Sequence, residues 1–154
     1  MKRGLKRKVF DSILRFEKWF FEEKEPSEWE EIDWTFILEK LIEVFPNAES
    51  RIFLSDRLYH ICSKQDILDF LMLDETDQER YETEFFDCDD FSFRLMGQFH
   101  VKPYASLAFG IAWSKTHAYN VAVTKEGVYI VEPQTDTVFL PRKEELYEAV
   151  LIII

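Results

Sequence analysis

Hydrophobic side chains recur at helical spacing in the first third of the chain. Over residues 5–23 they return every three or four positions, which predicts an amphipathic helix. A second run with this period begins near Ser27 and ends near Phe45, just before Pro46. Ser27 and Glu30 have the spacing of a capping box, in which each side chain accepts a hydrogen bond from the backbone of the other residue. The second helix is therefore expected to start at Ser27.

The middle of the chain combines both kinds of pattern. The stretch RIFLSDRLYHIC, residues 51–62, is rich in β-forming residues and predicts one or two short strands. Ser63 and Asp66 are the start signal of a helix over the following KQDILDFLML. An acidic connection occupies residues 74–86. Residues 88–99 then predict a buried helix, because the apolar side chains of that run share one side.

From Ser106 onward the period changes to that of strands. Short β-type runs separated by turn residues follow one another: SLAFGIAWS, THAYNVAVT, GVYIVEP, DTVFL and AVLIII. Helices followed by an antiparallel sheet are typical of an α+β domain. Because no linker interrupts the pattern, we expect a single domain over residues 1–154, with a helical N-terminal extension over 1–50 and a core over 51–154.

The composition narrows the functions that this domain can have. Of its 154 residues 47% are hydrophobic, and its net charge of -11 argues against binding nucleic acid through general electrostatics. The start lacks the apolar segment and cleavage site of a secretory signal, and no apolar run is long enough to cross a membrane. The two cysteines cannot form a disulfide framework. We therefore expect a cytoplasmic protein with no nucleic-acid partner and no stable membrane insertion.

Three reactive side chains stand at the boundaries of expected elements. Cys88 begins the helix over residues 88–99, where free backbone N–H groups and the helix dipole favour a thiolate. His117 begins one strand and Glu132 ends the next. In a hairpin that turns near residue 125 the two lie almost opposite each other, and directly paired residues in antiparallel strands are about 4.5–5.5 Å apart. A helix packed across that hairpin would bring nucleophile, base and orienting acid together.

The segments FFDCDDFSF, HAYN and IVEPQTD, in this order, resemble the papain/transglutaminase-like cysteine hydrolase superfamily. The similarity is greatest to the C-terminal cysteine-protease domain of a mushroom agglutinin, that of Marasmius oreades, and to its prokaryotic and viral relatives. The resemblance implies a papain-like fold over residues 51–154, in which the nucleophile helix packs on the C-terminal sheet. It also implies that Cys88 is the nucleophile, His117 the general base and Glu132 the acid that orients the base.

The same resemblance implies calcium beside the active centre. The positions that would hold it are Asp89, Asp90, Gln134 and Asp136. Oxygen ligands of this kind suit calcium or magnesium rather than zinc. A carboxylate beside Cys88 opposes ionisation of the thiol, and a bound cation would cancel that charge. The expected cofactor is therefore Ca²⁺ or another divalent cation, and no organic cofactor is expected.

The expected function is that of a peptidase or amidase, with a peptide or other amide as its substrate. Cys88 would form a thioester with the acyl group, which water then releases. Two other functions stay open. A metal-dependent phosphodiesterase or nuclease would use Asp89, Asp90, Glu132 and Asp136, although the negative charge of the chain opposes it. A non-enzymatic binding or assembly module would keep the fold without the chemistry, since the oxyanion donors of a hydrolase are unassigned.

Overall fold

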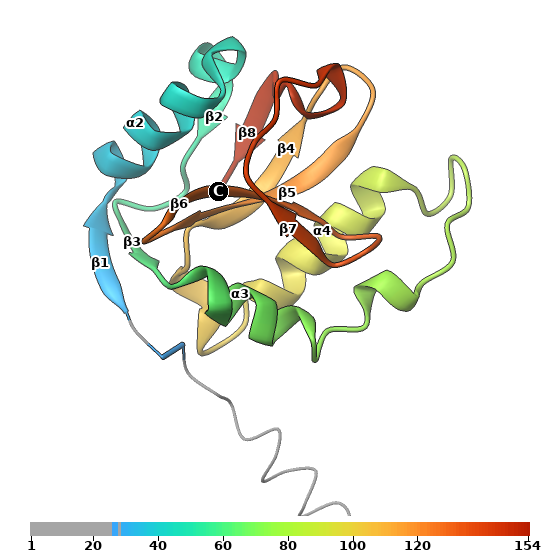
Figure 1. Ribbon diagram of the computed structural model, residues 1–154, viewed down its shortest axis with the longest axis horizontal. Helices are drawn as coiled ribbons and strands as arrows, with labels where there is room; N and C mark the ends of the chain where they lie inside the picture. Colours follow the sequence, from blue (N-terminus) through green and yellow to red (C-terminus); the bar gives the residue numbers. More distant parts are fainter. Residues whose placement is uncertain (1–25, 28) are drawn as a thin grey trace, which may run out of the picture.

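The computed structural model describes residues 26–27 and 29–154, and the helix expected over residues 5–23 lies outside them. Figure 1 shows the described chain as a central sheet with helices packed around it. The helices and strands are β1 Glu30–Asp33, α2 Trp34–Val44, β2 Ile52–Phe53, β3 Leu58–Ile61, α3 Lys64–Leu71, α4 Cys88–Phe99, β4 Phe109–Trp113, β5 Ala118–Thr124, β6 Gly127–Glu132, β7 Thr137–Phe139 and β8 Leu151–Ile153. Short 3₁₀ turns occupy Pro46–Arg51, Thr76–Gln78, Tyr104–Ser106 and Glu145–Tyr147.

Helix α2 begins later than its sequence pattern suggested. Asp33 caps it, because Asp33 Oδ1 accepts hydrogen bonds from the backbone N–H of Thr35 at 2.9 Å and from its hydroxyl at 2.8 Å. The residues before this cap form β1, which pairs antiparallel with β3. The capping box expected at Ser27 and Glu30 is therefore wrong, since the backbone of β1 is used for strand pairing. The expected end of this helix near Phe45 is confirmed.

Two expected helix starts are confirmed. Ser63 and Asp66 form a capping box at the start of α3. Helix α4 begins at Cys88, and Asp90 Oδ2 accepts a hydrogen bond at 3.1 Å from the backbone N–H of Asp87, the residue before the helix. Both signals act within one turn of the chain, which explains why the sequence alone could locate them.

The main sheet has six strands in the order β2-β8-β4-β5-β6-β7. From β8 through β4, β5 and β6 to β7, each strand is antiparallel to the next, whereas β2 runs parallel to β8. Strand β8 approaches β4 so closely at Gly110 that a Cβ there would lie 2.0 Å from the carbonyl oxygen of Ile153. Only glycine fits at that point.

Strand β5 separates two apolar clusters, one on each face of the sheet. Val121 packs in the first cluster with Ile37 and Leu41 of α2. Ala122 belongs to the second, together with Leu95 of α4. Side chains alternate between faces along a strand, so α2 covers one face and α3 and α4 cover the other (Figure 1). Burial of each large aliphatic side chain contributes about 1.5–3 kcal/mol.

The observed fold corrects the expected class, an α+β papain-like domain with helices first and an antiparallel sheet after them. Strands β2 and β3 confirm the short strands expected over residues 51–62, but β1 lies where a helix was expected, and β2 enters the main sheet as the parallel neighbour of β8. Helices and strands are therefore mixed along the sequence. The short edge strand β2 pairs with a distant part of the chain, as Ile52 does with Ile152. Periodicity within a segment carries no information about such a partner. Among the described residues, no helix is long and apolar enough to cross a membrane.

Candidate functional site

Helix α4 carries Cys88 in its first turn, beside strand β5. Ser92, one turn later, donates a hydrogen bond from Oγ to the carbonyl oxygen of Cys88 at 2.8 Å. The buried amide of Asn120 on β5 donates to the carbonyl oxygens of Ser92 and Gly110, both at 3.0 Å. Asn120 therefore ties α4 to β4 and β5, and these bonds fix where Cys88 lies over the sheet.

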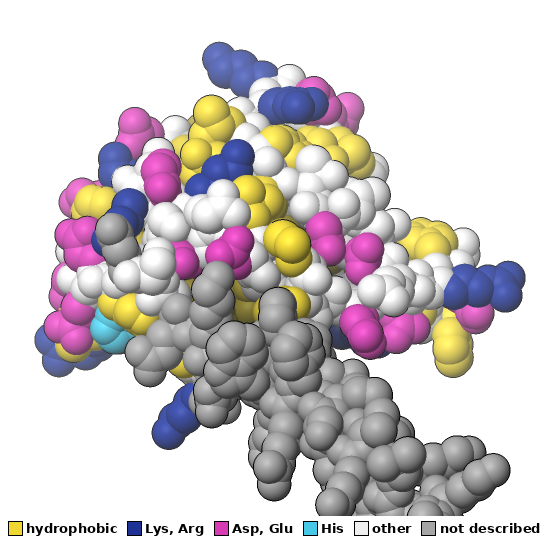
Figure 2. All heavy atoms as spheres, turned by 60° about the horizontal axis from the view of Figure 1, so that its bottom comes forward, with side chains coloured by type: hydrophobic (Ala, Val, Ile, Leu, Met, Phe, Trp, Pro, Cys, Tyr) yellow, Lys and Arg dark blue, Asp and Glu magenta, His cyan; other side chains and the backbone are white. Residues whose placement is uncertain are grey.

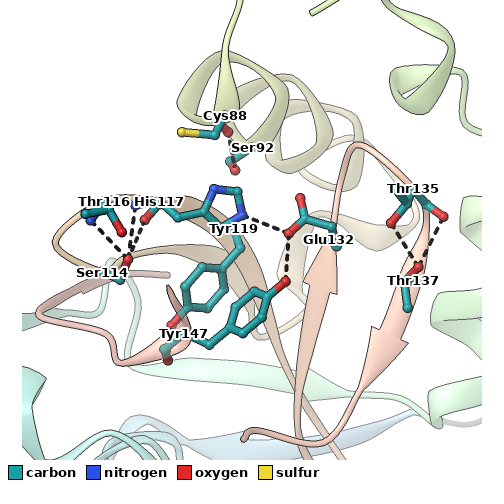
Figure 3. Close-up of polar contacts among 10 residues, drawn as sticks. All are labelled: Cys88, Ser92, Ser114, Thr116, His117, Tyr119, Glu132, Thr135, Thr137 and Tyr147. Carbon is teal, nitrogen blue, oxygen red and sulfur yellow. Dashed lines mark hydrogen bonds and ion pairs between the residues drawn. The ribbon is translucent and has the colours of Figure 1, made fainter. Parts of the chain in front are cut away.

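His117 and Glu132 meet at one end of the β5–β6 hairpin, as the spacing predicted. The strand register pairs Asn120 with Val131, which places the residues just beyond that pair near each other. His117 Nε2 lies 2.8 Å from Glu132 Oε2, and each side chain is only 12% exposed. The hydroxyl of Ser114 accepts a hydrogen bond from the backbone N–H of His117 at 3.0 Å and so fixes the turn before β5 (Figure 3).

Tyr147 completes this cluster, and no motif in the sequence pointed to it. Its hydroxyl donates to Glu132 Oε2 at 3.3 Å, while the Tyr119 hydroxyl donates to the Tyr147 carbonyl oxygen at 2.7 Å. Figure 3 shows the two tyrosine rings on the opposite side of the imidazole from Cys88. Burial raises the pKa of Tyr147 and the charge of Glu132 raises it further, so the hydroxyl stays protonated and remains a donor.

The Cys88 thiol lies beside this cluster without bonding to it. Burial raises the pKa of the thiol, a hydrogen bond from the Ala118 backbone opposes that change, and the charges of Asp87 and Asp89 add to it. No hydrogen bond joins Cys88 to the His117 ring among the described residues. Burial and the two carboxylates therefore favour the neutral thiol, against the helix dipole that was expected to favour a thiolate.

The acids around Cys88 bond to one another. Asp87, Cys88 and Asp89 offer ligand atoms within 4.8 Å of one another. A hydrogen bond between the two carboxyl groups lowers the pKa of Asp87 and raises that of Asp89, so the first proton taken up goes to Asp89. Asp90 is occupied in the helix cap described above. Asp89 and Asp90, two of the four expected metal positions, are therefore engaged in bonds at the helix start.

Asp136 lies in the turn between β6 and β7. Burial raises its pKa to about 6, and the nearby charges of Asp77 and Asp74 contribute to that shift. Asp136 Oδ1 and the hydroxyl of Thr76 are buried without a hydrogen-bond partner among the described residues. Figure 2 shows acidic side chains toward the end of the molecule where Figure 1 places residues 74–87.

Among the described residues, the group of acidic and cysteine ligand atoms that lie within 4.8 Å of one another is Asp87, Cys88 and Asp89, so the expected metal positions Asp89, Asp90 and Asp136 do not form such a group. Asp89 and Asp90 lie at the start of α4, whereas Asp136 lies near Asp74 and Asp77. Among the described residues, the Gln134 side chain forms no hydrogen bond with any of these acids. A hard cation needs several oxygen ligands, and among the described residues Asp136 Oδ1 and the Thr76 hydroxyl are buried oxygens without a hydrogen-bond partner. The acids of the connection 74–86 were overlooked as ligands because nothing local connects them with residue 136.

Comparisons with known proteins identify the domain. A family model described as "Ricin-type beta-trefoil lectin C-terminal domain" matches residues 37–154. A solved complex of PSL1a with E64 has a TM-score of 0.69 and 23% identity, and the match covers 80% of this chain and 51% of that one. The Polyporus squamosus lectin bound to the human-type influenza-binding epitope Neu5Acα2-6Galβ1-4GlcNAc has a TM-score of 0.63 and 21% identity, with 80% and 49% covered. No curated protein sequence matches the chain.

These findings correct the expected family. The family model over residues 37–154 describes a lectin domain and one of the two structures is named as a lectin, so assignment to the papain/transglutaminase-like cysteine hydrolases is overturned. The expected peptidase or amidase activity, the peptide substrate and the thiol-protease class fall with it. The non-enzymatic binding module, which sequence analysis left open, fits the findings better. The chain spans about half the length of the solved lectins, 51% and 49%.

Proposed function

Because the chain belongs to the family of ricin-type β-trefoil lectin C-terminal domains, we propose that it is a non-enzymatic binding or assembly module. The family model covers residues 37–154, which include both apolar clusters and the candidate site. One of the structurally similar lectins is described with a bound sialylated trisaccharide. Carbohydrate is therefore the first class of ligand to test on this chain.

The site at Glu132 is the place where a ligand would bind. Glu132 Oε2 is bonded to His117 and Tyr147, but Glu132 Oε1 is buried and has no partner among the described residues. A buried acceptor left without a donor costs about 1–3 kcal/mol. A hydroxyl or amide group of a ligand would satisfy this oxygen, and sugars carry many such donors. This unpartnered oxygen is the observation that supports the proposal best.

Cys88 and His117 would line the same site without reacting. The raised pKa of Cys88 keeps the thiol protonated at neutral pH, so it would contact a ligand as a weak donor rather than attack it. His117 is held by Glu132 on one side and by its backbone bond to Ser114 on the other. A site with so little freedom suits recognition by shape and hydrogen bonds.

A glycan array followed by calorimetry on the best ligand tests the proposal. We expect Glu132→Gln to weaken binding about ten-fold, because the amide nitrogen cannot accept the hydrogen bond that Oε1 would accept. Glu39→Gln, on the exposed face of α2, makes the same change of charge far from the site and should leave affinity unchanged. Thermal unfolding of both variants would show whether Glu132→Gln also damages the fold.

Two results would overturn the proposal. One is equal affinity of the wild type and Glu132→Gln for every ligand found. The other is hydrolysis of a peptide mixture by the purified chain that disappears in Cys88→Ala, because a binding module has no such activity. Both assays use the same preparation, so an inactive sample is recognised by its failure to bind.

A divalent cation beside Asp136 is a second proposal. The buried unpartnered oxygens of Asp136 and Thr76, with the acids Asp74 and Asp77 nearby, are the donor set that calcium or magnesium prefers. The cation would neutralise the charges of Asp74 and Asp77, which raise the pKa of Asp136. Asp89, Asp90 and Gln134 would take part only if the start of α4 rearranged, because Asp90 is engaged in the cap.

Two further expectations stay proposals. Both cysteines are free, as expected in a reducing compartment, and this supports a cytoplasmic location. A single domain over residues 1–154 also remains the expected organisation. The packing of Ile37 and Leu41 of α2 against the sheet supports it for the described residues.

A further inference from the structure

A cavity of about 500 Å³ lies between the end of α2, strand β6 and residues 140–149. Its volume falls within the range of sites that hold small organic molecules, about 300–1,000 Å³. Its walls are mostly apolar, formed by Val44, Phe45, Val128 and Leu140. This cavity lies apart from Cys88 and has no role in the function proposed above.

The inner wall of the cavity is formed by buried side chains, while its mouth is exposed. Phe45 and Val128 are each 4% exposed and belong to the apolar cluster under α2. Leu140, in contrast, is 60% exposed although it lines the cavity. An apolar side chain of this size, left in solvent beside a hollow, would be covered by the hydrocarbon part of a ligand.

The mouth also carries two cations on a chain whose net charge is -11. The Arg142 guanidinium lies 4.9 Å from the ring of Phe139 and 3.8 Å from the Glu144 carboxylate. Lys143 also lines the cavity, and no described carboxylate forms an ion pair with it. Glu148 is the one acid among the lining residues. The lining therefore has a local excess of positive charge above an apolar floor.

We propose that this cavity binds a small amphipathic carboxylate, a fatty acid of medium chain length. The hydrocarbon chain packs against Phe45 and Val128, and the carboxylate lies between Arg142 and Lys143. Arginine recognises a carboxylate with two parallel hydrogen bonds, and lysine adds a point charge. The ring of Tyr147 lines the same cavity and its hydroxyl bonds to Glu132, so the ligand would touch the side chain that holds this acid in place.

Calorimetry with sodium decanoate and decan-1-ol, both below their aggregation limits, tests the proposal. The two probes share the chain and differ in the charge of the head group. We expect one decanoate per protein, bound about ten-fold more tightly than decanol. Charge reversal of both cations, in Arg142→Glu/Lys143→Glu, should weaken decanoate binding by about ten-fold or more and leave decanol binding unchanged.

The matched control is Arg80→Glu/Lys102→Glu, which reverses two exposed cations outside the cavity. It should bind both probes as the wild type does. A second variant, Val44→Phe, fills part of the cavity and should weaken both probes, with circular dichroism as the check on its fold. The proposal is overturned if decanoate does not bind, if decanol binds as tightly as decanoate, or if the Arg142→Glu/Lys143→Glu variant matches the control.

Discussion

The carboxylates of Asp66 and Asp136 are both at least partly buried, yet their pKa values are shifted in opposite directions. Asp66 is 6% exposed and accepts hydrogen bonds from the backbone N–H of Ser27 at 2.8 Å and from the N–H and hydroxyl of Ser63 at 3.0 and 2.7 Å. Burial raises its pKa, but these donors outweigh burial and bring the pKa below the ordinary value. Asp136 Oδ1 has no partner among the described residues, and burial raises the pKa of Asp136 to about 6.

The opposite pKa shifts of Asp66 and Asp136 show what decides whether a buried carboxylate stabilises the fold or is available to bind a ligand. Donors fixed by the backbone make the carboxylate of Asp66 part of the structure, since it joins the start of α3 to Ser27. Without such donors, an acid keeps its proton or binds a cation or another ligand that supplies what the protein does not. Glu132 lies between these cases, because its Oε2 has two hydrogen-bond partners and its Oε1 has none among the described residues.

The largest expected effect is that of Asp66→Asn. The amide nitrogen faces donors and cannot accept their hydrogen bonds, so the cap of α3 and the bond to Ser27 weaken together. We expect the free energy of unfolding to fall by about 2–3 kcal/mol at pH 7, measured by urea denaturation. Because the pKa of Asp66 is lowered in the fold, this loss should shrink as the pH falls below the ordinary value of 3.8 and through the lower pKa that Asp66 has in the folded chain. A loss below 0.5 kcal/mol would show that Asp66 differs little from an exposed acid.

Calcium should stabilise the fold through Asp136, the second carboxylate of the comparison. If Asp136 and Thr76 form a cation site, calcium at about ten times its dissociation constant stabilises the fold by about 1.4 kcal/mol, which raises the melting temperature by about 3–6 °C. Asp136→Asn should lose most of this rise, whereas Asp90→Asn should keep it, because Asp90 is engaged in the α4 cap. Equal rises in both variants, or none in the wild type, would remove the cation site.

Without calcium, Asp136→Asn should stabilise the chain at neutral pH. The folded pKa of about 6 lies above the unfolded value of 3.8, so ionised Asp136 opposes folding and the protonated form does not. Any contribution of Asp136 is fully present below pH 3.8 and is lost as the pH rises through 6. Allowing for solvent screening, we expect a gain of about 1 kcal/mol at pH 7 in urea denaturation, and none at pH 3.5. A gain that does not depend on pH would point to a cause other than this charge.

Features that depend on neighbours in the sequence could be predicted, and those that depend on distant partners could not. The starts of α3 and α4 and the contact of His117 with Glu132 follow from spacings within a turn or a hairpin. Tyr147, which bonds the same glutamate, reaches it from a loop beyond β7 that no periodicity connects with the hairpin. The acids near Asp136 were missed for the same reason. Burial of Cys88, which raises the pKa of its thiol, likewise depends on distant parts of the chain and could not be read from the start of the helix.

The acids beside Cys88 are a third case, in which two carboxyl groups bond each other and act on a thiol. Asp87 and Asp89 both raise the pKa of Cys88, after burial, so iodoacetamide should label Cys88 slowly at pH 8. Asp89→Asn removes one of these charges and should speed labelling by about two- to five-fold. Cys62 is an internal control, since burial raises its pKa to about 12 and should leave it unlabelled. Rapid labelling of wild-type Cys88 at mildly acidic pH would show that the residue is a thiolate. The charges of Asp87 and Asp89 would then have to be neutralised, because they could not be raising the pKa of the thiol.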